Sequence, residues 1–523
     1  MGCKTLSMPG TTSAPRGFEE NVARRKMTSG YVSRPYIKDL TEFDYPNSEL
    51  VFGFVCPTGT NFVPILQGFK RLLKKYNYTV EEVHLSNYLE RLKYELKSAP
   101  ECDRIETRMD AARDACEKAE RNNLMAIAAV TEIASKRNSD ANGKREPKSR
   151  VAHLLVSLKR PEEVSTLRKI YGSGFYLIGI FATEEERLQY LISCNTPQDK
   201  AKELIERDQN EEHPYGQKTR KTFHLSDIFV RTTAYKHELD RFLQLVFCNP
   251  YVTPTPQERG MFFAYAASMR SAQLGRQVGA CLVAEGGEEL LSVGCNDVPK
   301  VGGGLYWPGL KDRRDHILGC DSNDEEINRI VGNLEGKIGP YVQPPQGGKH
   351  PDLKLIIKEV LGITEFGRAV HAEMDALLSC TRIGISPMDA TLYTTTFPCH
   401  NCTRHIISAG IKNVYYIEPY VKSRAKELHG DEIRIEESSA EEKNKKSTEQ
   451  TGKLEFKSFV GIGPRRFIDF FSMSIGDGYE LERKSNGRKI QWKENLAIPR
   501  VSMRPNSYLE REMLAEHLIN PRS

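Results

Sequence analysis

No stretch of the sequence approaches the roughly 20 consecutive apolar residues that a membrane-spanning helix requires. The first residues also lack the apolar core of a secretory signal peptide. An excess of charge of one sign is missing as well, because 75 Lys and Arg residues face 70 Asp and Glu residues, for a net charge of +5. A nearly neutral chain gives no overall case for nucleic-acid binding. We therefore expect a cytoplasmic protein with no membrane partner.

Internal repeats of about 20–50 residues are also absent, which excludes solenoids and similar arrays. The 523 residues, 39% of them hydrophobic, suffice for several soluble cores at about 150 residues per domain. Twelve cysteines in a long intracellular chain indicate buried thiols or metal ligands rather than disulfides. These features predict a multidomain globular protein in which thiols can serve as metal ligands.

The N-terminal half divides into a tail and a domain. Residues 1–46 are rich in Ser, Thr, Pro, Gly and charge, and we expect a flexible tail there. Residues 47–250 contain apolar runs typical of buried strands, separated by helical patterns; the runs are 49–55, 151–158 and 175–182. This alternation predicts an α/β domain with a parallel sheet.

The C-terminal half, residues 251–523, predicts a second α/β domain. Its strand patterns are 278–285, 290–296, 390–397 and 413–420, and its clearest helix patterns are 261–274, 371–380 and 399–410. Gly- and Pro-rich stretches predict an irregular insertion at about 300–365. A run of charge predicts a surface loop at 436–453.

The strongest chemical signal is a pair of short motifs in this second domain. His371-Ala-Glu373 is followed, after 24 residues, by Pro398-Cys399-x-x-Cys402. Zinc takes nitrogen and sulfur ligands, and a catalytic zinc site keeps one position for water. Two cysteines three positions apart at the start of a helix share a face, so they can hold one ion together with His371. We predict a zinc site with His371, Cys399 and Cys402 as ligands.

Glu373 lies two positions from His371, so it can stand beside an activated water without binding the metal. There it can accept a proton from the water and pass it to a leaving amine. This arrangement is the signature of zinc-dependent nucleobase deaminases, and it makes Glu373 the catalytic candidate. The alternative is a structural zinc site, which would normally use four protein ligands.

Two further motifs carry a family resemblance. Ser271 precedes Arg276-Gln-Val-Gly-Ala, and Gly294-Cys-Asn296-Asp-Val-Pro299 follows. With the zinc motifs, they make the C-terminal half similar to the cytidine and deoxycytidylate deaminase superfamily, and within it to deoxycytidylate deaminases. The resemblance implies a five-stranded sheet flanked by helices and a role for Asn296 in contacting substrate. The alternative for Asn296 is a turn residue.

For two other groups of residues, the sequence allows more than one role. His316, Cys320 and Asp321 could form a second metal site, although their spacing matches no established motif. The segment 461–466, Gly-Ile-Gly-Pro-Arg-Arg, could bind a phosphate, and a turn with solvated arginines is an equal alternative.

The first predicted strand is followed by a loop that opens a helix, as in a phosphate-binding P-loop. The nucleotide-binding candidates in it are Gly53, Thr58, Gly59 and Thr60. The spacing of Gly53 and Gly59 is one residue too long, and Thr60 stands where a P-loop has its lysine. The loop therefore predicts either nucleotide binding without rapid hydrolysis or a structural remnant.

This loop, the segment Ser157-Leu-Lys-Arg-Pro-Glu-Glu-Val164 and the deaminase half together resemble one group over residues 47–475. The group is the bacterial antiviral cytidine deaminases, which join a P-loop kinase-like domain to a deoxycytidylate deaminase domain. The resemblance implies two α/β domains and an enzyme that depletes deoxycytidine nucleotides during phage infection. The expected partners are a deoxycytidine nucleotide substrate, a nucleotide at the N-terminal loop, a regulatory RNA and further copies of the chain in a homo-oligomer.

The sequence predicts zinc-dependent hydrolytic deamination of dCMP or dCTP to the deoxyuridine nucleotide. One alternative is a deaminase of cytosine or adenine in RNA or DNA, since these enzymes share the zinc motif. No dense array of basic and aromatic residues near the motif supports polymer binding. The other alternative is a nucleotide- or RNA-sensing switch in which deamination is secondary.

Overall fold

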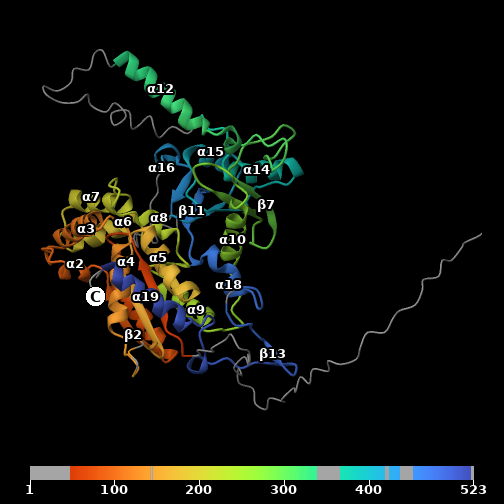
Figure 1. Cartoon of the computed structure of the whole chain (residues 1–523). Helices are drawn as coiled ribbons and strands as arrows, with labels where there is room; N and C mark the ends of the chain where they lie inside the picture. The colour runs from red at the N-terminus through yellow and green to blue at the C-terminus, as the bar shows by residue number, and fades with distance from the viewer. Residues whose placement is uncertain are drawn as a thin grey trace, which may run out of the picture.

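The computed structural model describes residues 47–338, 366–418, 423–435 and 452–519, apart from 142, 144 and 477. The predicted tail, nearly all of the predicted charged loop and the later part of the predicted insertion lie outside these residues. The chain forms two α/β units, each built on a six-stranded sheet (Figure 1). None of the helices in the described part combines the length and apolar character that crossing a membrane requires.

The first sheet has the order β12-β5-β4-β1-β3-β2, and β1 to β5 are parallel, as predicted. Strand β1 (Leu50–Val55) lies in the middle and is buried throughout, so its sequence is an unbroken apolar run. The other strands are β2 (Thr79–His84), β3 (Val151–Val156), β4 (Phe175–Phe181), β5 (Ile228–Arg231) and β12 (Gly461–Ile462). Strands β2 and β5 escaped prediction because β2 carries two glutamates and β5 has only four residues.

Helices cover both faces of this sheet. Side chains of α1 and α9 pack on one face and those of α4, α5 and α19 on the other. The helices of this unit are α1 (Val63–Lys75), α2 (Asn87–Arg91), α3 (Glu101–Lys118), α4 (Leu124–Ser135), α5 (Pro161–Tyr171), α6 (Glu184–Ser193), α7 (Gln198–Gln209), α8 (Thr219–Phe223), α9 (Tyr235–Val246), α18 (Phe467–Phe471) and α19 (Pro505–Ile519).

The second sheet has the order β10-β11-β9-β8-β6-β7, in which β6 is antiparallel to both neighbours and the rest are parallel. Its strands are β6 (Gly279–Val283), β7 (Leu290–Cys295), β8 (Thr391–Thr394), β9 (Asn413–Tyr416), β10 (Ile433–Ile435) and β11 (Leu454–Ser458). The resemblance implied five strands, and the three-residue edge strand β10 is the sixth. A small hairpin, β13 (Lys484–Ser485) and β14 (Arg488–Lys489), stands apart.

Helices also cover both faces of the second sheet. Helix α10 (Pro256–Ser268) packs on one face, and α14 (Ala372–Ile383) and α15 (His400–Ser408) pack on the other. The predicted insertion contains two helices among the described residues, α11 (Asp315–Leu318) and α12 (Ser322–Ile338). Later in the chain, α16 (Ala425–His429) lies beside α15. The second unit is therefore an α/β/α sandwich, as expected.

The chain returns to the first unit after β11. Strand β12 pairs with β5, and α19 packs on α4. Buried Arg137 bonds both Glu49 of the first unit and Glu512 of α19, with N–O distances of 2.6–2.9 Å. The sequence predicts that these final residues belong to the second domain, but the structure packs β12 and α19 on the first unit.

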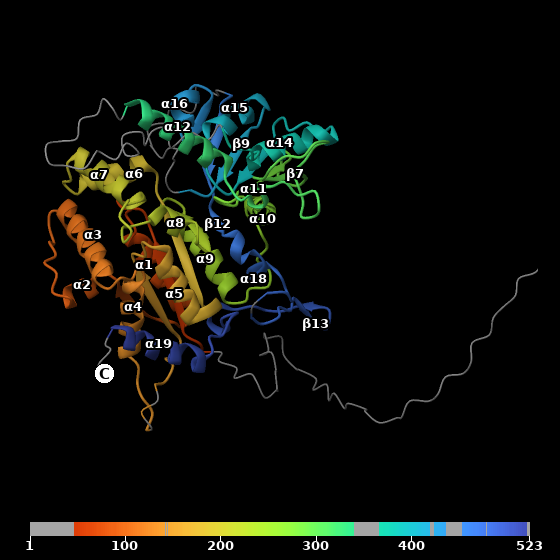
Figure 2. The same cartoon turned by 45° about the horizontal axis from the view of Figure 1, so that its top comes forward.

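The two units share a continuous apolar core through α10. Met261 and Ala264 on this helix belong to the same buried cluster as Phe223 and Phe229 of the first unit. In both views α10 lies on the side of the second unit that faces the first (Figure 2). Arg220 of α8 adds an ion pair to buried Glu418, which follows β9. The second unit is thus held against the first by both packing and charge.

Candidate metal centre and catalytic pocket

The structure brings the three predicted zinc ligands together. His371 is the N-cap of α14, Cys399 is the N-cap of α15, and Cys402 lies in the first turn of α15. The Nδ1 atom of His371 lies 3.4 Å from Sγ of Cys399 and 3.3 Å from Sγ of Cys402. Among the described residues, these are the single group of three whose donor atoms gather closely enough for one ion. Helix N-termini favour thiolates, so both helices support the donor set.

The pKa values of the two thiols are shifted in opposite directions. The hydrogen bond from Cys402 and the contact with His371 lower the pKa of Cys399 to about 4, against the effect of burial. The same hydrogen bond, together with burial, raises the pKa of Cys402 well above its usual value. Cys399 is therefore the thiol that loses its proton first, and its hydrogen bond with His371 raises the pKa of that imidazole. A bound cation would favour loss of the protons that remain on the donor set. Such a donor set suits zinc.

Glu373 lies beside this group without belonging to it. Its side chain is 3% exposed, its Oε1 accepts a hydrogen bond of 3.2 Å from Thr394, and its Oε2 lies 3.4 Å from Sγ of Cys402. Burial raises the pKa of Glu373, although a backbone hydrogen bond and the charge of His371 partly lower it. A buried carboxyl with a raised pKa can both accept and release a proton near neutral pH.

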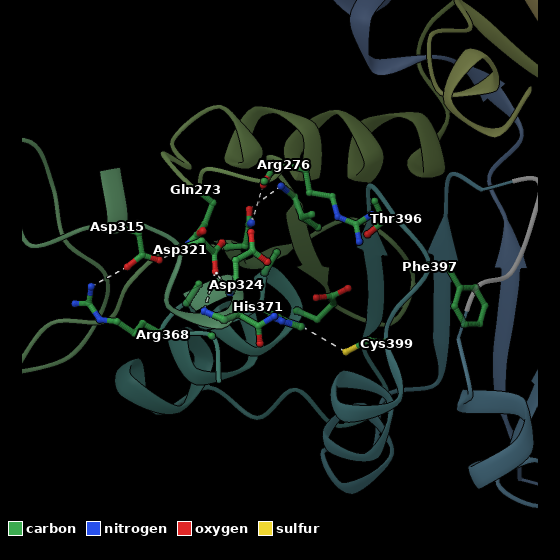
Figure 3. A pocket seen from close by; sticks show the side chains of 18 residues that line it. Gln273, Arg276, Asp315, Asp321, Asp324, Arg368, His371, Thr396, Phe397 and Cys399 are labelled. Atoms are coloured by element: carbon green, nitrogen blue, oxygen red, sulfur yellow. Dashed lines mark hydrogen bonds and ion pairs between the residues drawn. The ribbon is translucent and has the colours of Figure 1, made fainter. Parts of the chain in front are cut away.

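A cavity of about 270 Å³ opens over His371, Glu373 and Cys399. Its walls differ in charge. Asp315, Asp321 and Asp324 line one part, where Arg368 donates a hydrogen bond of 2.7 Å to Asp315. Arg276 and Thr396 lie on the other side, away from Asp315 and Arg368 (Figure 3). An anionic ligand in this pocket would be drawn toward the Arg276 side.

Asn296, to which the resemblance gives a role in contacting substrate, lines the same cavity. Its Oδ1 accepts a hydrogen bond of 2.7 Å from the backbone N–H of Val278, and its Nδ2 donates one of 2.8 Å to the carbonyl of Arg276. Asn296 therefore fixes the backbone of the segment that carries Arg276. Asp297, the next residue, is buried and accepts a hydrogen bond of 3.4 Å from Arg314.

The alternative second metal site is not assembled. His316, Cys320 and Asp321 do not gather within ligand distance of one ion among the described residues. Asp321 instead accepts the backbone N–H of Asn323 at 2.9 Å at the start of α12. The sulfur of Cys320 interacts with Glu325, which raises its pKa.

The structure places the four N-terminal loop candidates in different settings. Gly53 lies within β1, where an added Cβ would come 2.5 Å from Leu158, so close packing explains this glycine. Gly59 has φ +87°, and an added Cβ would lie 2.7 Å from the carbonyl oxygen of Arg187. The loop conformation itself therefore requires Gly59. Thr60 is buried, and its backbone N–H bonds the carbonyl of Pro57 at 3.1 Å.

The backbone of the loop binds a carboxylate from the protein itself. The N–H of Thr58 donates to Oδ2 of fully buried Asp208, and Lys159 and Thr219 donate to Oδ1. Lys159 also donates to the carbonyl of Cys56 in the same loop, at 2.8 Å. Sequence reasoning missed this arrangement, because Asp208 lies far along the chain and Lys159 was noted only as part of a family motif.

Part of the second unit matches a known protein family. Residues 254–418 match the family described as cytidine and deoxycytidylate deaminase zinc-binding region. The matched segment contains His371, Glu373, Cys399 and Cys402. This part of the chain is therefore similar to the zinc-binding region of cytidine and deoxycytidylate deaminases, and it has a His/Cys/Cys group that could hold a metal ion.

Individual relatives align over short segments. ComE operon protein 2 of Bacillus subtilis (strain 168) is 49% identical over 53 residues, which are 10% of this chain and 28% of that protein. A deoxycytidylate deaminase of Enterobacteria phage T2 is 42% identical over 55 residues, 10% of this chain and 29% of that protein. The chain thus spans less than a third of the length of either relative. The crystal structure of a dCMP deaminase from the cyanophage S-TIM5, in complex with dCMP and dUMP, has 18% identity and a TM-score of 0.22, covering 40% of this chain and 100% of that one.

Proposed function

We propose that this chain is a zinc-dependent enzyme that hydrolyses the 4-amino group of deoxycytidine nucleotides, dCMP or dCTP. The observation that carries the proposal is the placement of His371, Cys399 and Cys402 at two helix N-termini, with the buried carboxyl of Glu373 beside them. His371, Cys399 and Cys402 would hold the zinc ion. When bound there, zinc supplies Lewis-acid activation of a water molecule at neutral pH.

The residues of the chain would carry the proton transfers. Glu373 would accept a proton at a carboxyl oxygen as water adds to C4 of the cytosine, and would return it so that the amine leaves as ammonia. The raised pKa of Glu373, caused by burial, suits a group that takes and gives a proton. Thr394 would keep the carboxyl oriented through its 3.2 Å hydrogen bond. Asn296, by fixing the backbone of Arg276 and Val278, would hold the substrate side of the pocket in place.

A substrate panel tests this proposal. The full chain is incubated with dCMP, dCTP, CTP, deoxycytidine and cytosine-containing oligonucleotides, and ammonia release is measured with zinc content. We expect release from the deoxycytidine nucleotides and loss of release in a Glu373→Gln variant. Deamination of the oligonucleotides alone would favour a polymer deaminase instead. Zinc binding with no deamination of any substrate would favour a sensing switch.

We propose further that the first unit acts as a P-loop-like regulatory domain that binds a nucleotide at residues 56–61. Its support is a parallel sheet whose central strand leads through a glycine-containing loop into α1. The two-domain chain resembles the bacterial antiviral cytidine deaminases. An antiviral role would fit this resemblance, with depletion of deoxycytidine nucleotides, a regulatory RNA and a homo-oligomeric assembly. Phage plating on cells that express the chain or its Glu373→Gln variant tests that role, since protection must depend on Glu373.

A further inference from the structure

A second cavity, of about 530 Å³, lies where the two units meet. The first unit contributes residues of α8 and the 3-10 helix η4 (Pro464–Arg466), and the second contributes α10 and the segments beside β6 and β8. Its volume is within the range of about 300–1,000 Å³ that is usual for small-molecule sites. The cavity can therefore take a ligand of nucleotide size.

The lining of this cavity is basic. Arg220, Lys221, His224, Arg276 and Arg465 contribute to it, and none of its lining residues is acidic. Glu418, which does not line the cavity, neutralises Arg220 and lies 3.5 Å from Nε2 of His224. Lys221, Arg276 and Arg465 have no ion pair within the described residues. Uncompensated cations that converge on one cavity are suited to an anion with several charges.

The cavity adjoins the catalytic pocket. Arg276 and Thr396 line both of them, so the two share a wall. The opposite part of the catalytic pocket carries Asp315, Asp321 and Asp324, of which Arg368 neutralises Asp315, so its remaining negative charge would repel phosphate groups. A nucleotide with its base near Glu373 would thus direct its phosphates past Arg276, toward the basic cavity.

The segment 461–466 explains how Arg465 reaches this place. Strand β12 pairs with β5, and Arg466 then turns inward, donating hydrogen bonds to the carbonyls of Ser173 and Phe175 at 3.0 and 2.8 Å. Arg466 thereby anchors the segment, while the neighbouring Arg465 is exposed and lines the cavity. The two arginines have different roles, and one of them is available to a ligand.

We propose that this cavity between the units binds the phosphate chain of a nucleoside 5′-polyphosphate, with Lys221 and Arg465 as binding residues. Such a phosphate chain can come from two kinds of nucleotide. The phosphates belong either to a triphosphate substrate whose base lies in the catalytic pocket, or to a second nucleotide bound beside it. The identification of the source rests on the proposed deaminase function, whereas the binding of polyphosphate does not.

Binding is tested first, with inorganic tripolyphosphate and the full zinc-loaded chain in a calorimetric titration. The Lys221→Gln/Arg465→Gln double variant should bind about 10²- to 10⁴-fold more weakly, since it loses two charged hydrogen bonds and each has an effect of about 10- to 100-fold. The control, Lys202→Gln/Arg488→Gln, removes the same charge from exposed residues that do not line the cavity. Equal affinity in wild type and the cavity variant, or an equal loss in the control, would overturn the proposal. Because no deamination is needed, this result stands apart from failure of the deaminase assignment.

Kinetics then distinguish the two sources. If the substrate supplies the phosphates, the cavity variant should lose about 10-fold or more in kcat/KM for dCTP and keep its value for dCMP. If a second nucleotide supplies them, dTTP, which has no 4-amino group, should change the rate on dCMP in wild type and not in the cavity variant. In a chain that deaminates dCMP or dCTP, tripolyphosphate binding that depends on Lys221 and Arg465 but has neither kinetic effect would mean an adventitious ion only and would also overturn the proposal.

Discussion

The carboxylate of Asp208 accepts a hydrogen bond of 2.9 Å from the backbone N–H of Thr58, 150 residues away in the sequence. Loops between a central strand and a helix bind phosphate through such N–H groups. Here Asp208, supported by Lys159 at 2.8 Å, already uses one of them. Any nucleotide at this loop must therefore compete with a carboxylate of the protein itself.

Replacing Asp208 with asparagine should favour an external anion. The amide carries no charge, so Lys159 and the Thr58 N–H lose their anionic partner and become available to a phosphate. We expect nucleotide affinity at the loop to rise by at least about tenfold, the equivalent of one charged hydrogen bond. Titration of the full chain with ATP and dNTPs measures this.

Asp199→Asn is the matched control, because Asp199 lies on the same helix, α7, and is exposed. A folded Asp208→Asn protein that binds no nucleotide would favour the structural remnant over a binding loop. A change at Gly59 is a poorer probe, because its φ of +87° and its contact with Arg187 make any side chain disturb the loop.

The geometry of the metal site was predictable from the sequence, whereas the N-terminal loop and the segment 461–466 were noted as possible phosphate sites without the tertiary contacts that define them. The His-x-Glu and Cys-x-x-Cys motifs each lie within one turn at a helix start, so local spacing fixes most of the geometry. The Asp208 contact joins residues that only the tertiary fold brings together. The basic cavity likewise requires Arg465 to reach the interface through β12, a two-residue strand too short to leave a sequence pattern.

Glu373→Gln should abolish most activity and keep the metal. The amide preserves the shape of the side chain but cannot shuttle protons, and general acid–base groups contribute about 10²- to 10⁴-fold. Ammonia release and zinc content measured on the same sample test both halves. Glu285→Gln, which changes an exposed glutamate, should behave as wild type. A rate within tenfold of wild type would remove Glu373 from the proposed mechanism.

Cys402→Ala should lose zinc as well as activity, because only two of the three proposed ligands remain. The loss of zinc affinity should exceed the roughly 10- to 100-fold effect of removing an outer-shell partner. Cys380→Ala is a suitable control, since Cys380 is equally buried, on α14, and is not a proposed ligand. Full zinc occupancy in Cys402→Ala, measured by atomic emission, would mean that the ligand set is different.

The buried cluster of Glu49, Arg137 and Glu512 makes a prediction about acid stability. Burial would raise the pKa of Glu49, but His153, whose Nε2 lies 3.8 Å from Oε1, and the hydrogen bonds from Arg137 outweigh this and lower the pKa from 4.5 to about 2. A carboxyl with a depressed pKa in the folded state stabilises the protein above its unfolded pKa. That stability is lost as the pH falls from about 4.5 toward 2, where the folded carboxyl is also protonated.

Glu49→Gln should therefore lower the free energy of unfolding by about 3 kcal/mol at pH 7, the equivalent of the shift of its pKa from 4.5 to about 2. Arg137 keeps Glu512 as its second partner. The difference from wild type should shrink as the pH is lowered through the range from 4.5 to about 2. Urea unfolding followed by circular dichroism at several pH values measures it. Glu95→Gln, at an exposed position, should stay within about 0.5 kcal/mol of wild type throughout. A difference for Glu49→Gln that is constant with pH would show that packing, rather than the charge of Glu49, holds α19 against the first unit.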